Sequence, residues 1–229
     1  MIKEPIIKTK NLIKTFIDGE KETRVLKGID FEAEMGSWIS IMGRSGAGKS
    51  TFLYQISLLD HPTSGDVVIF GKDTHDLSHE ERTRFRLNEL GYVFQDYALL
   101  PDLTAIENVA VPIMMQGKSK AEAYEESKKS LERVGLGSRL ANLPSQLSGG
   151  EQQRVSVARA IAHKPKILFA DEPTANLDAE SAWTVLELFR ELHKDGQTII
   201  MVTHEDEYTK YSTRIIHLDD GKIVEDKTN

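Results

Sequence analysis

The chain has 229 residues, a formal net charge of −7 and no cysteine. This length suffices for one domain, or for one domain with an inserted subdomain. The acidic balance argues against nucleic acid as a main partner, and the lack of cysteine excludes disulfides and thiolate metal sites. The N-terminal stretch MIKEPIIKTK is too charged for a signal peptide, and no apolar run approaches the ~20 residues that span a bilayer, so we expect no direct membrane insertion.

The first third of the chain is predicted to form strands. Apolar residues favour strands at Ile6–Leu12 and Val25–Ala33, with a polar turn at 18–20 between them. Phe16 is an aromatic residue on a loop edge just before this turn. The sequence alone leaves open whether its ring is a partly buried anchor or serves a function.

An apolar strand at Ile39–Met42 then breaks into glycines and restarts as a helix. Four residues fill the fixed positions of the phosphate-binding loop G-x-x-x-x-G-K-[ST], namely Gly43, Gly48, Lys49 and Ser50. Glycines let backbone N–H groups surround phosphate oxygens, and the start of the helix adds a partial positive charge. Lys49 adds a full positive charge, and Ser50 offers a hydroxyl to the metal that accompanies the phosphates.

The alternative to a phosphate site is a glycine-rich turn with a surface lysine, which would not need the complete set of residues between a strand and a helix. We therefore predict a site for a nucleoside triphosphate, although kinases, GTPases, helicases and transport ATPases all share this motif. The predicted residues are Gly43, Arg44, Ser45, Gly46, Ala47, Gly48, Lys49, Ser50 and Thr51.

The segment after this loop alternates turns, strands and helices. A turn at 62–65 precedes a short strand at Val67–Phe70, and an S-x-x-E capping box predicts a helix from His79 to about Asn88. His75 precedes the cap, so it should not share a helix face with His79, and we expect both imidazoles to be solvated.

Helix signals dominate from Tyr97 to Ile161, after a strand at Gly91–Phe94 that stops at Gln95. One signal is a second capping box, at Ser119, which starts a helix. Gly135 is expected to end this helix. Because this stretch interrupts a strand-rich chain, we interpret it as an inserted helical subdomain.

Two further apolar strands are predicted in the last third. Lys166–Ala170 ends at Asp171, Thr198–Val202 ends at Thr203 and His204, and a helix capped by Asp178 lies between the strands. This order implies parallel strands joined by right-handed crossovers. The site should then lie outside their carboxyl ends, where polar residues from several strands converge.

The polar residues at these strand ends have predicted roles in hydrolysis. An acidic pair after a strand can simply cap a helix, but beside a phosphate-binding loop Asp171 is better interpreted as holding magnesium through a water. Glu172, one residue further out, would polarise the water that attacks the γ-phosphorus. His204 would hydrogen-bond the γ-phosphate or that water.

The segment LSGGEQQ at Leu147–Gln153, taken with the other motifs, resembles the ATP-binding subunit of an ATP-binding-cassette (ABC) transporter. The resemblance covers nearly the whole chain and implies an Mg-dependent ATPase with an α/β fold. The fold would comprise a RecA-like P-loop NTPase core with a mostly parallel sheet, an N-terminal antiparallel β subdomain and an inserted α-helical subdomain. The implied ranges of the single domain 1–229 are 1–96 and 163–229 for the core with the β subdomain, and 97–162 for the helical subdomain.

The resemblance also implies a head-to-tail homodimer with each ATP between the P-loop of one subunit and the LSGGE segment of the other. In such a dimer Phe16 stacks on adenine, and Gln95 contacts magnesium and connects the site to the helical subdomain. Asp178 would lie across the dimer interface. The signature residues that act on the ATP of the opposite subunit would be Ser148, Gly149 and Gly150.

Glu151 departs from the commonest family pattern, which has glutamine at this position. Ser148 and Glu151 also have capping-box spacing, so Ser148 can be a simple helix cap. The two roles are compatible, because a hydroxyl can accept from the helix and donate to a phosphate oxygen. We expect the charged Glu151 side chain to turn back toward the cap.

The segment RTRFRLNELGYVFQ, beginning at Arg82, is most like the ATPase subunits of lipoprotein-releasing and macrolide-exporting transporters. This implies a peripheral subunit on the cytoplasmic face of the cell membrane, attached through a transmembrane permease subunit. Apolar residues that follow Gln95 either contact this partner or belong to the subdomain core, namely Tyr97, Leu99, Leu100 and Leu103. An alternative is a regulatory or mechanical ABC ATPase, such as the cell-division type, that moves no cargo.

Overall fold

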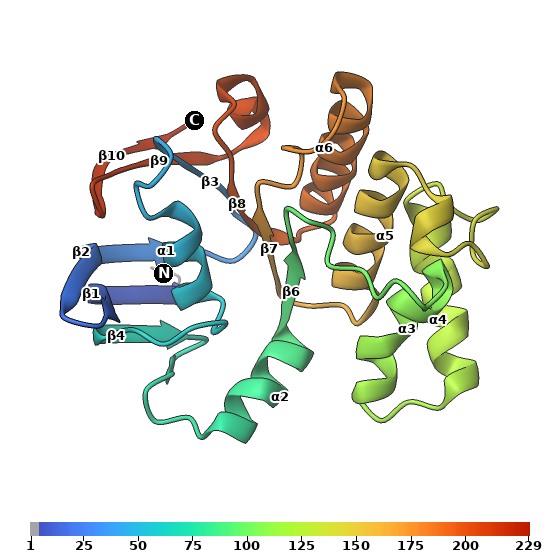
Figure 1. Ribbon diagram of the computed structural model, residues 1–229, viewed down its shortest axis with the longest axis horizontal. Coiled ribbons are helices and arrows are strands. Elements are labelled where there is room, and N and C mark those ends of the chain that lie inside the picture. Colours follow the sequence, from blue (N-terminus) through green and yellow to red (C-terminus); the bar gives the residue numbers. More distant parts are fainter. Residues whose placement is uncertain (1–4) are drawn as a thin grey trace. The chain divides into compact units, whose positions relative to one another are not determined.

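The structure is a computed structural model that describes residues 5–229 and is shown in Figure 1. The first four residues of the charged N-terminal stretch therefore lie outside the described residues. The chain divides into two compact units. Unit 1 contains the described residues up to Arg86 together with Gly196–Asn229, and unit 2 contains Leu87–Asp195.

An antiparallel sheet in unit 1 confirms the predicted N-terminal β region. Its order is β2-β1-β4-β5, with β1 at Ile7–Asp18, β2 at Lys21–Ala33, β4 at Ser64–Ile69 and β5 at Lys72–Asp73. The first two strands are longer than predicted, because their pairing continues to Asp18 opposite Lys21 at a tight turn. Phe16 therefore lies within β1, opposite Thr23, and not on a loop edge.

Unit 1 also contains neighbouring strands in the order β10-β9-β3-β8. These are β3 at Trp38–Met42, β8 at Thr198–Val202, β9 at Arg214–Asp219 and β10 at Lys222–Thr228. As predicted, β3 and β8 are fully buried and parallel. The β9–β10 hairpin was not predicted, although the Asp220-Gly221 pair at its turn is a known hairpin signal.

Three helical segments accompany the strands of unit 1. They are α1 at Lys49–Ile56, α2 at His79–Glu89, which leads into unit 2, and the short 3-10 helix η2 at Asp206–Tyr211. The predicted capping box before α2 is confirmed, since Ser78 and Glu81 exchange hydrogen bonds. His75 and His79 are both exposed, as expected.

Unit 2 contains a parallel pair of strands and the predicted helical stretch (Figure 1). The strands are β6 at Leu90–Val93 and β7 at Ile167–Asp171. The helices are α3 at Ala105–Met115, α4 at Lys120–Arg133, the 3-10 helix η1 at Pro144–Gln146, α5 at Gly149–Ala162 and α6 at Ala179–Lys194. Helices α3, α4 and α5 pack on one another. The division at 97–162 remains a prediction.

The buried face of α6 has the predicted periodicity. All five of its predicted apolar positions are buried, namely Ala182, Val185, Leu186, Phe189 and Leu192.

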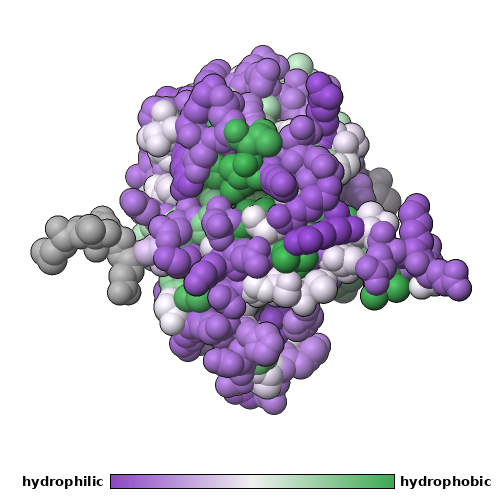
Figure 2. Space-filling model, turned by 90° about the vertical axis from the view of Figure 1, so that its left-hand side faces the viewer, coloured by the Kyte–Doolittle hydropathy of each residue, from purple (hydrophilic) through white to green (hydrophobic). Residues whose placement is uncertain are grey.

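The face drawn in Figure 2 is mainly hydrophilic and has a smaller hydrophobic area. In the part of the chain that the structure describes, no helix is both long and apolar enough to cross a membrane.

Asn108 fixes the loop that leads into α3. Its side chain is buried, with 1% exposed. The side-chain oxygen accepts from the Leu100 N–H at 2.8 Å, and the amide nitrogen donates to the carbonyls of Leu100 at 3.0 Å and Leu103 at 2.8 Å. These bonds join backbone groups of Leu100 and Leu103 to a buried side chain and so fix the turn.

We predict that Asn108→Ala lowers the free energy of unfolding by about 2–4 kcal/mol, because several hydrogen bonds of a buried side chain, worth about 1 kcal/mol each, are lost. Urea denaturation followed by circular dichroism measures the loss. The matched control is Gln116→Ala, whose part-buried amide makes longer bonds of 3.2 and 3.3 Å to Leu87 and Asn88. Equal stabilities of the two variants would contradict the role of Asn108.

Candidate active site

Helix α1 begins differently from the helices of unit 2. Four of those helices begin at a side chain that accepts a hydrogen bond from the first turn, namely Thr104 in α3, Ser119 in α4, Ser148 in α5 and Asp178 in α6. In contrast, α1 begins at Gly48, which has a φ of 97° and no side-chain cap in the described residues. Because the first N–H groups of a helix need acceptors from outside it, this start fits an anion such as a phosphate.

The loop before α1 packs tightly against other backbone. A Cβ atom on Gly43, which has a φ of 145°, would lie 2.2 Å from the Leu218 carbonyl oxygen. The Gly221 N–H donates to the Ala47 carbonyl at 3.1 Å, and a Cβ atom on Gly221 would lie 2.2 Å from the Val25 carbonyl oxygen. Both positions therefore require glycine, and the β9–β10 hairpin fixes the loop.

The charged end of the Lys49 side chain lies against this loop. Only 7% of the residue is exposed, and Nζ donates to the Arg44 carbonyl at 3.2 Å. Ser50 follows as a half-buried residue in the first turn of α1. The loop thus combines a helix start, a buried ammonium group and a hydroxyl, which are the groups expected around a triphosphate.

The carboxyl ends of β3 and β8 meet in unit 1. Ile41 lies opposite Val202 in the parallel register, and the Thr203 N–H extends the ladder by donating to the Ile41 carbonyl at 3.2 Å. His204 follows as an exposed residue whose Nε2 lies 3.1 Å from Glu205 Oε1. The phosphate-binding loop and His204 therefore both follow adjacent parallel strands, as predicted.

A second pair of strand ends meets in unit 2. Val93 lies opposite Ala170, so Gln95 follows the strand next to the one that ends at Asp171. Asp171 is the last residue of β7 and is 5% exposed. Glu172 comes next with a φ of 42°. A left-handed backbone is costly for a residue other than glycine, and such strain gathers at functional sites.

Gln153 contacts the segments that follow both of these strands. The sequence alone did not predict this role. Its side chain is fully buried, and Nε2 donates to the Pro173 carbonyl at 2.7 Å and lies 3.5 Å from the Phe94 carbonyl. The buried amide thus fixes the segments that follow both β6 and β7. The only sequence signal was its place in the LSGGEQQ motif.

Ser148 caps α5, and Glu151 turns back toward it as predicted. Ser148 Oγ accepts from the Glu151 N–H at 3.3 Å, and Glu151 Oε2 accepts from the Ser148 N–H at 2.9 Å. Arg139 Nε donates to the other carboxylate oxygen at 3.1 Å. The Ser148 backbone bond and the nearby Arg139 lower the pKa of Glu151 despite some desolvation, so the cap is a charged one.

The two glycines after Ser148 allow close packing in unit 2. A Cβ atom on Gly149 would lie 3.0 Å from Tyr97 Oη, and one on Gly150 would lie 2.6 Å from Ser181 Oγ. Ser181 is itself fixed by Asp178, which accepts from its N–H at 2.9 Å and from its hydroxyl at 2.8 Å. These bonds lower the pKa of Asp178. The signature and the loop before α6 are therefore packed together.

Phe16 is 46% exposed on β1, and Lys14 Nζ lies 4.9 Å from its ring centroid. An exposed ring of this kind is not a core anchor. An exposed aromatic face is suited to stacking on another flat ring.

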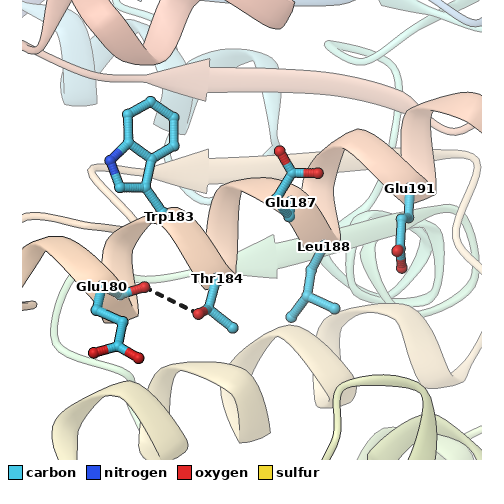
Figure 3. Close-up of a pocket in the computed structure, with 6 residues that line it drawn as sticks. All are labelled: Glu180, Trp183, Thr184, Glu187, Leu188 and Glu191. Atoms are coloured by element: carbon cyan, nitrogen blue, oxygen red, sulfur yellow. Dashed lines mark hydrogen bonds between the residues drawn. The ribbon is translucent and has the colours of Figure 1, made fainter.

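An open groove on α6 is a poor nucleotide site. It is lined by Glu180, Trp183, Thr184, Glu187, Leu188 and Glu191 (Figure 3). The Thr184 hydroxyl donates to the Glu180 carbonyl at 2.9 Å, which is a bond within the helix. Three carboxylates would repel a triphosphate, so the lining of the groove does not suit a nucleotide.

Comparisons with known proteins agree with this description. The family model described as "ABC transporter" matches residues 26–175. The chain is 50% identical to an uncharacterized ABC transporter ATP-binding protein of Methanocaldococcus jannaschii over 96% of this chain and 98% of that protein. It is 45% identical to the lipoprotein-releasing system ATP-binding protein LolD of Aquifex aeolicus, over 96% of each chain.

Two further matches extend the comparison. The chain is 45% identical to the macrolide export ATP-binding/permease protein MacB of Aggregatibacter actinomycetemcomitans, but it spans only 34% of that longer protein. The structure matches the dimeric, post-hydrolysis ATP-binding cassette MJ0796 bound to ADP and Pi, with a TM-score of 0.91 and 40% identity over 97% of this chain and 98% of that chain. The chain therefore belongs to the ABC transporter family, as an ATPase cassette.

Proposed function

We propose that this chain is the ATP-hydrolysing subunit of a membrane exporter and works as a head-to-tail homodimer. The similarity to a dimeric cassette bound to ADP and Pi carries the proposal, because the cassette chain of that structure matches this chain with a TM-score of 0.91 over nearly its whole length. Each ATP would lie between the phosphate-binding loop of one subunit and Ser148–Gly150 of the other. Closure of the dimer around ATP would drive the attached permease.

The P-loop binds the triphosphate in this proposal. Residues Gly43–Thr51 supply backbone N–H groups, and Lys49 supplies the charge that neutralises the β- and γ-phosphates. Phe16 stacks on adenine with its exposed ring. Helix α1 begins at a left-handed glycine and not at a capping side chain, which supports this arrangement, since a helix N-terminus carries a partial positive charge that attracts phosphates.

Magnesium fits the site only together with the nucleotide. The described residues contain no group of three or more His, Cys, Asp or Glu side chains that could hold a metal ion. Ser50 and Gln95 would contact the ion directly, and Asp171 would hold it through a water. Phosphate oxygens and water would complete the octahedral set that magnesium requires, and the ion would neutralise charge on the phosphates.

Glu172 is the proposed general base for hydrolysis. Its carboxylate accepts a proton as water oxygen bonds to the γ-phosphorus and the bond to the bridging oxygen of ADP breaks. His204 hydrogen-bonds the γ-phosphate and orients it. The strained backbone of Glu172 after the buried β7 supports this role, because strain at a single residue fixes the direction of its side chain.

The opposite subunit completes each site. Ser148 donates its hydroxyl to the γ-phosphate while its lone pair accepts from the Glu151 N–H, and Gly149 and Gly150 leave room for the phosphate. The start of α5 also directs a partial positive charge at it. Asp178 lies across the interface.

The permease is proposed to dock on the loop before α3. Asn108 fixes this loop from inside, while Leu100 remains 48% exposed and Leu99 and Leu103 are partly buried. Apolar side chains on a fixed loop suit a protein partner. The subunit would then lie on the cytoplasmic face of the cell membrane without entering it.

We predict that Glu172→Gln lowers the rate of ATP hydrolysis by about 10²- to 10⁴-fold, because the general base is lost while the shape is kept. ATP binding should persist, so gel filtration with ATP and magnesium should show a stable dimer. Phosphate release measures the rate, and EDTA serves as a control for the metal requirement. Unimpaired turnover would exclude Glu172 as the base.

We predict that two inactive variants, Lys49→Ala and Ser148→Arg, regain activity when mixed. A mixed dimer has one site with an intact P-loop from one subunit and an intact signature from the other. Phosphate release from the mixture should rise well above the sum of the two variants alone. A mixture as inactive as its components would contradict a site shared between subunits.

We predict that Leu100→Asp reduces recovery of a membrane protein in pull-downs from detergent-solubilised membranes, since a charge would be buried in an apolar interface. ATP hydrolysis by the isolated chain should not change. Val224→Asp is the control, because Val224 is also exposed, at 63%, but lies in unit 1. Recovery of only soluble partners by the unaltered chain would instead favour a regulatory or mechanical ATPase.

A further inference from the structure

Tyr97 lies two residues after Gln95 in a strained segment of unit 2. Tyr97 has a φ of 59° and Ala98 a φ of 50°. Two consecutive left-handed residues other than glycine are unfavourable by themselves. Such a conformation persists only where surrounding contacts impose it. The contacts of this segment therefore indicate its structural role.

Arg159 of α5 imposes this conformation from one side. Nη2 donates to the Tyr97 carbonyl at 2.9 Å, and Nη1 donates to the Ala98 carbonyl at 2.6 Å. Burial lowers the pKa of the Arg159 guanidinium, but the group stays charged at neutral pH because its ordinary value is so high. Two charge-assisted bonds from one planar group therefore hold both carbonyls in a fixed orientation.

Asn176 binds the same segment from the other side. Its Nδ2 donates to the Gln95 carbonyl at 3.2 Å, and Tyr97 Oη donates to the Asn176 carbonyl at 3.4 Å. The two bonds run in opposite directions between one residue and the segment 95–97. A shift of either partner would strain both bonds at once.

The signature residue Gly149 packs against the junction, by which we mean Tyr97 and Asn176 with the hydrogen bond between them. A Cβ atom on Gly149 would lie 3.0 Å from Tyr97 Oη and 3.9 Å from the Asn176 carbonyl oxygen. Only a glycine leaves the Tyr97 hydroxyl its full room there. Tyr97 thus contacts the segment of Gln95, the segment of Asn176 that leads to Asp178, and the first turn of α5 after Ser148.

We propose that Tyr97 is a positioning residue that couples the two ATP sites of the dimer. This rests on the proposed function, in which Gln95 serves the ATP of its own subunit while Ser148 and Asp178 serve the ATP of the partner. Movement of Gln95 on ATP binding is transmitted through the Tyr97–Asn176 junction to the residues that face the other site. Occupation of one site thereby favours closure of the second.

The test compares Tyr97→Phe with Tyr124→Phe. The first variant removes the hydroxyl that contacts Asn176 and keeps the ring. The second removes a hydroxyl in the same unit that donates to Glu107 at 3.2 Å, away from the proposed junction. Three properties are measured, namely the Hill coefficient of ATP hydrolysis, the ATP concentration for half-maximal dimer in the Glu172→Gln background, and ATP affinity of the monomer at low protein concentration.

For Tyr97→Phe we expect a Hill coefficient that falls toward about 1 and a dimer midpoint raised about fivefold or more, at unchanged monomer affinity. Tyr124→Phe should match the unaltered chain. Asn176→Ala removes the opposing bond and should reproduce the effect, which keeps the test valid if Tyr97→Phe is unstable to urea.

Two results would overturn the coupling. In the first, the unaltered chain is cooperative, and both Tyr97→Phe and Asn176→Ala keep its Hill coefficient and its dimer midpoint. This result would exclude the role of Tyr97 and leave the proposed function intact. An unaltered chain that neither dimerises with ATP nor hydrolyses it cooperatively would overturn the coupling by removing the shared site itself.

Discussion

The rest of the structure depends on how a triphosphate can be bound by backbone N–H groups. A helix start that is already capped has fewer donors to offer, and α1 begins at a left-handed glycine with no side-chain cap in the described residues. The loop that leads into such a helix start must be held in place by other parts of the chain. The β9–β10 hairpin holds it through the Gly221 bond to Ala47, so the most distant part of the chain stabilises the loop.

Unit 2 concentrates strain at a few residues and fixes it with buried polar groups. Glu172, Tyr97 and Ala98 all have left-handed backbones. Gln153 and Arg159, both on α5, donate to carbonyls beside these residues. One helix therefore determines the conformation of the segments after β6 and β7, and the same helix begins with the signature. Its rigidity links the proposed base to the surface that would meet another subunit.

The signature glycines have a role inside the subunit as well as toward a phosphate. Gly149 makes room for Tyr97, and Gly150 makes room for Ser181. A side chain at Gly149 would crowd the Tyr97 hydroxyl, and one at Gly150 would clash with Ser181 at the start of α6, before either met any ligand. Loss of activity on substitution of these glycines therefore reports two effects, one on packing and one on the nucleotide, which only a binding measurement separates.

The sequence by itself determined the features that depend on neighbouring residues. Caps at Ser78, Ser119, Ser148 and Asp178 join residues three apart, and buried strands appear as short apolar runs, so the family, the main elements and the candidate residues were predictable. Only the tertiary structure revealed the hydrogen bond from Gly221 to Ala47, the Arg159 contacts, the Tyr97–Asn176 contact and the strain at Glu172. The first three depend on hydrogen bonds to backbone carbonyls far apart in the chain, and the last is a backbone angle, so none of them leaves a pattern in the side chains.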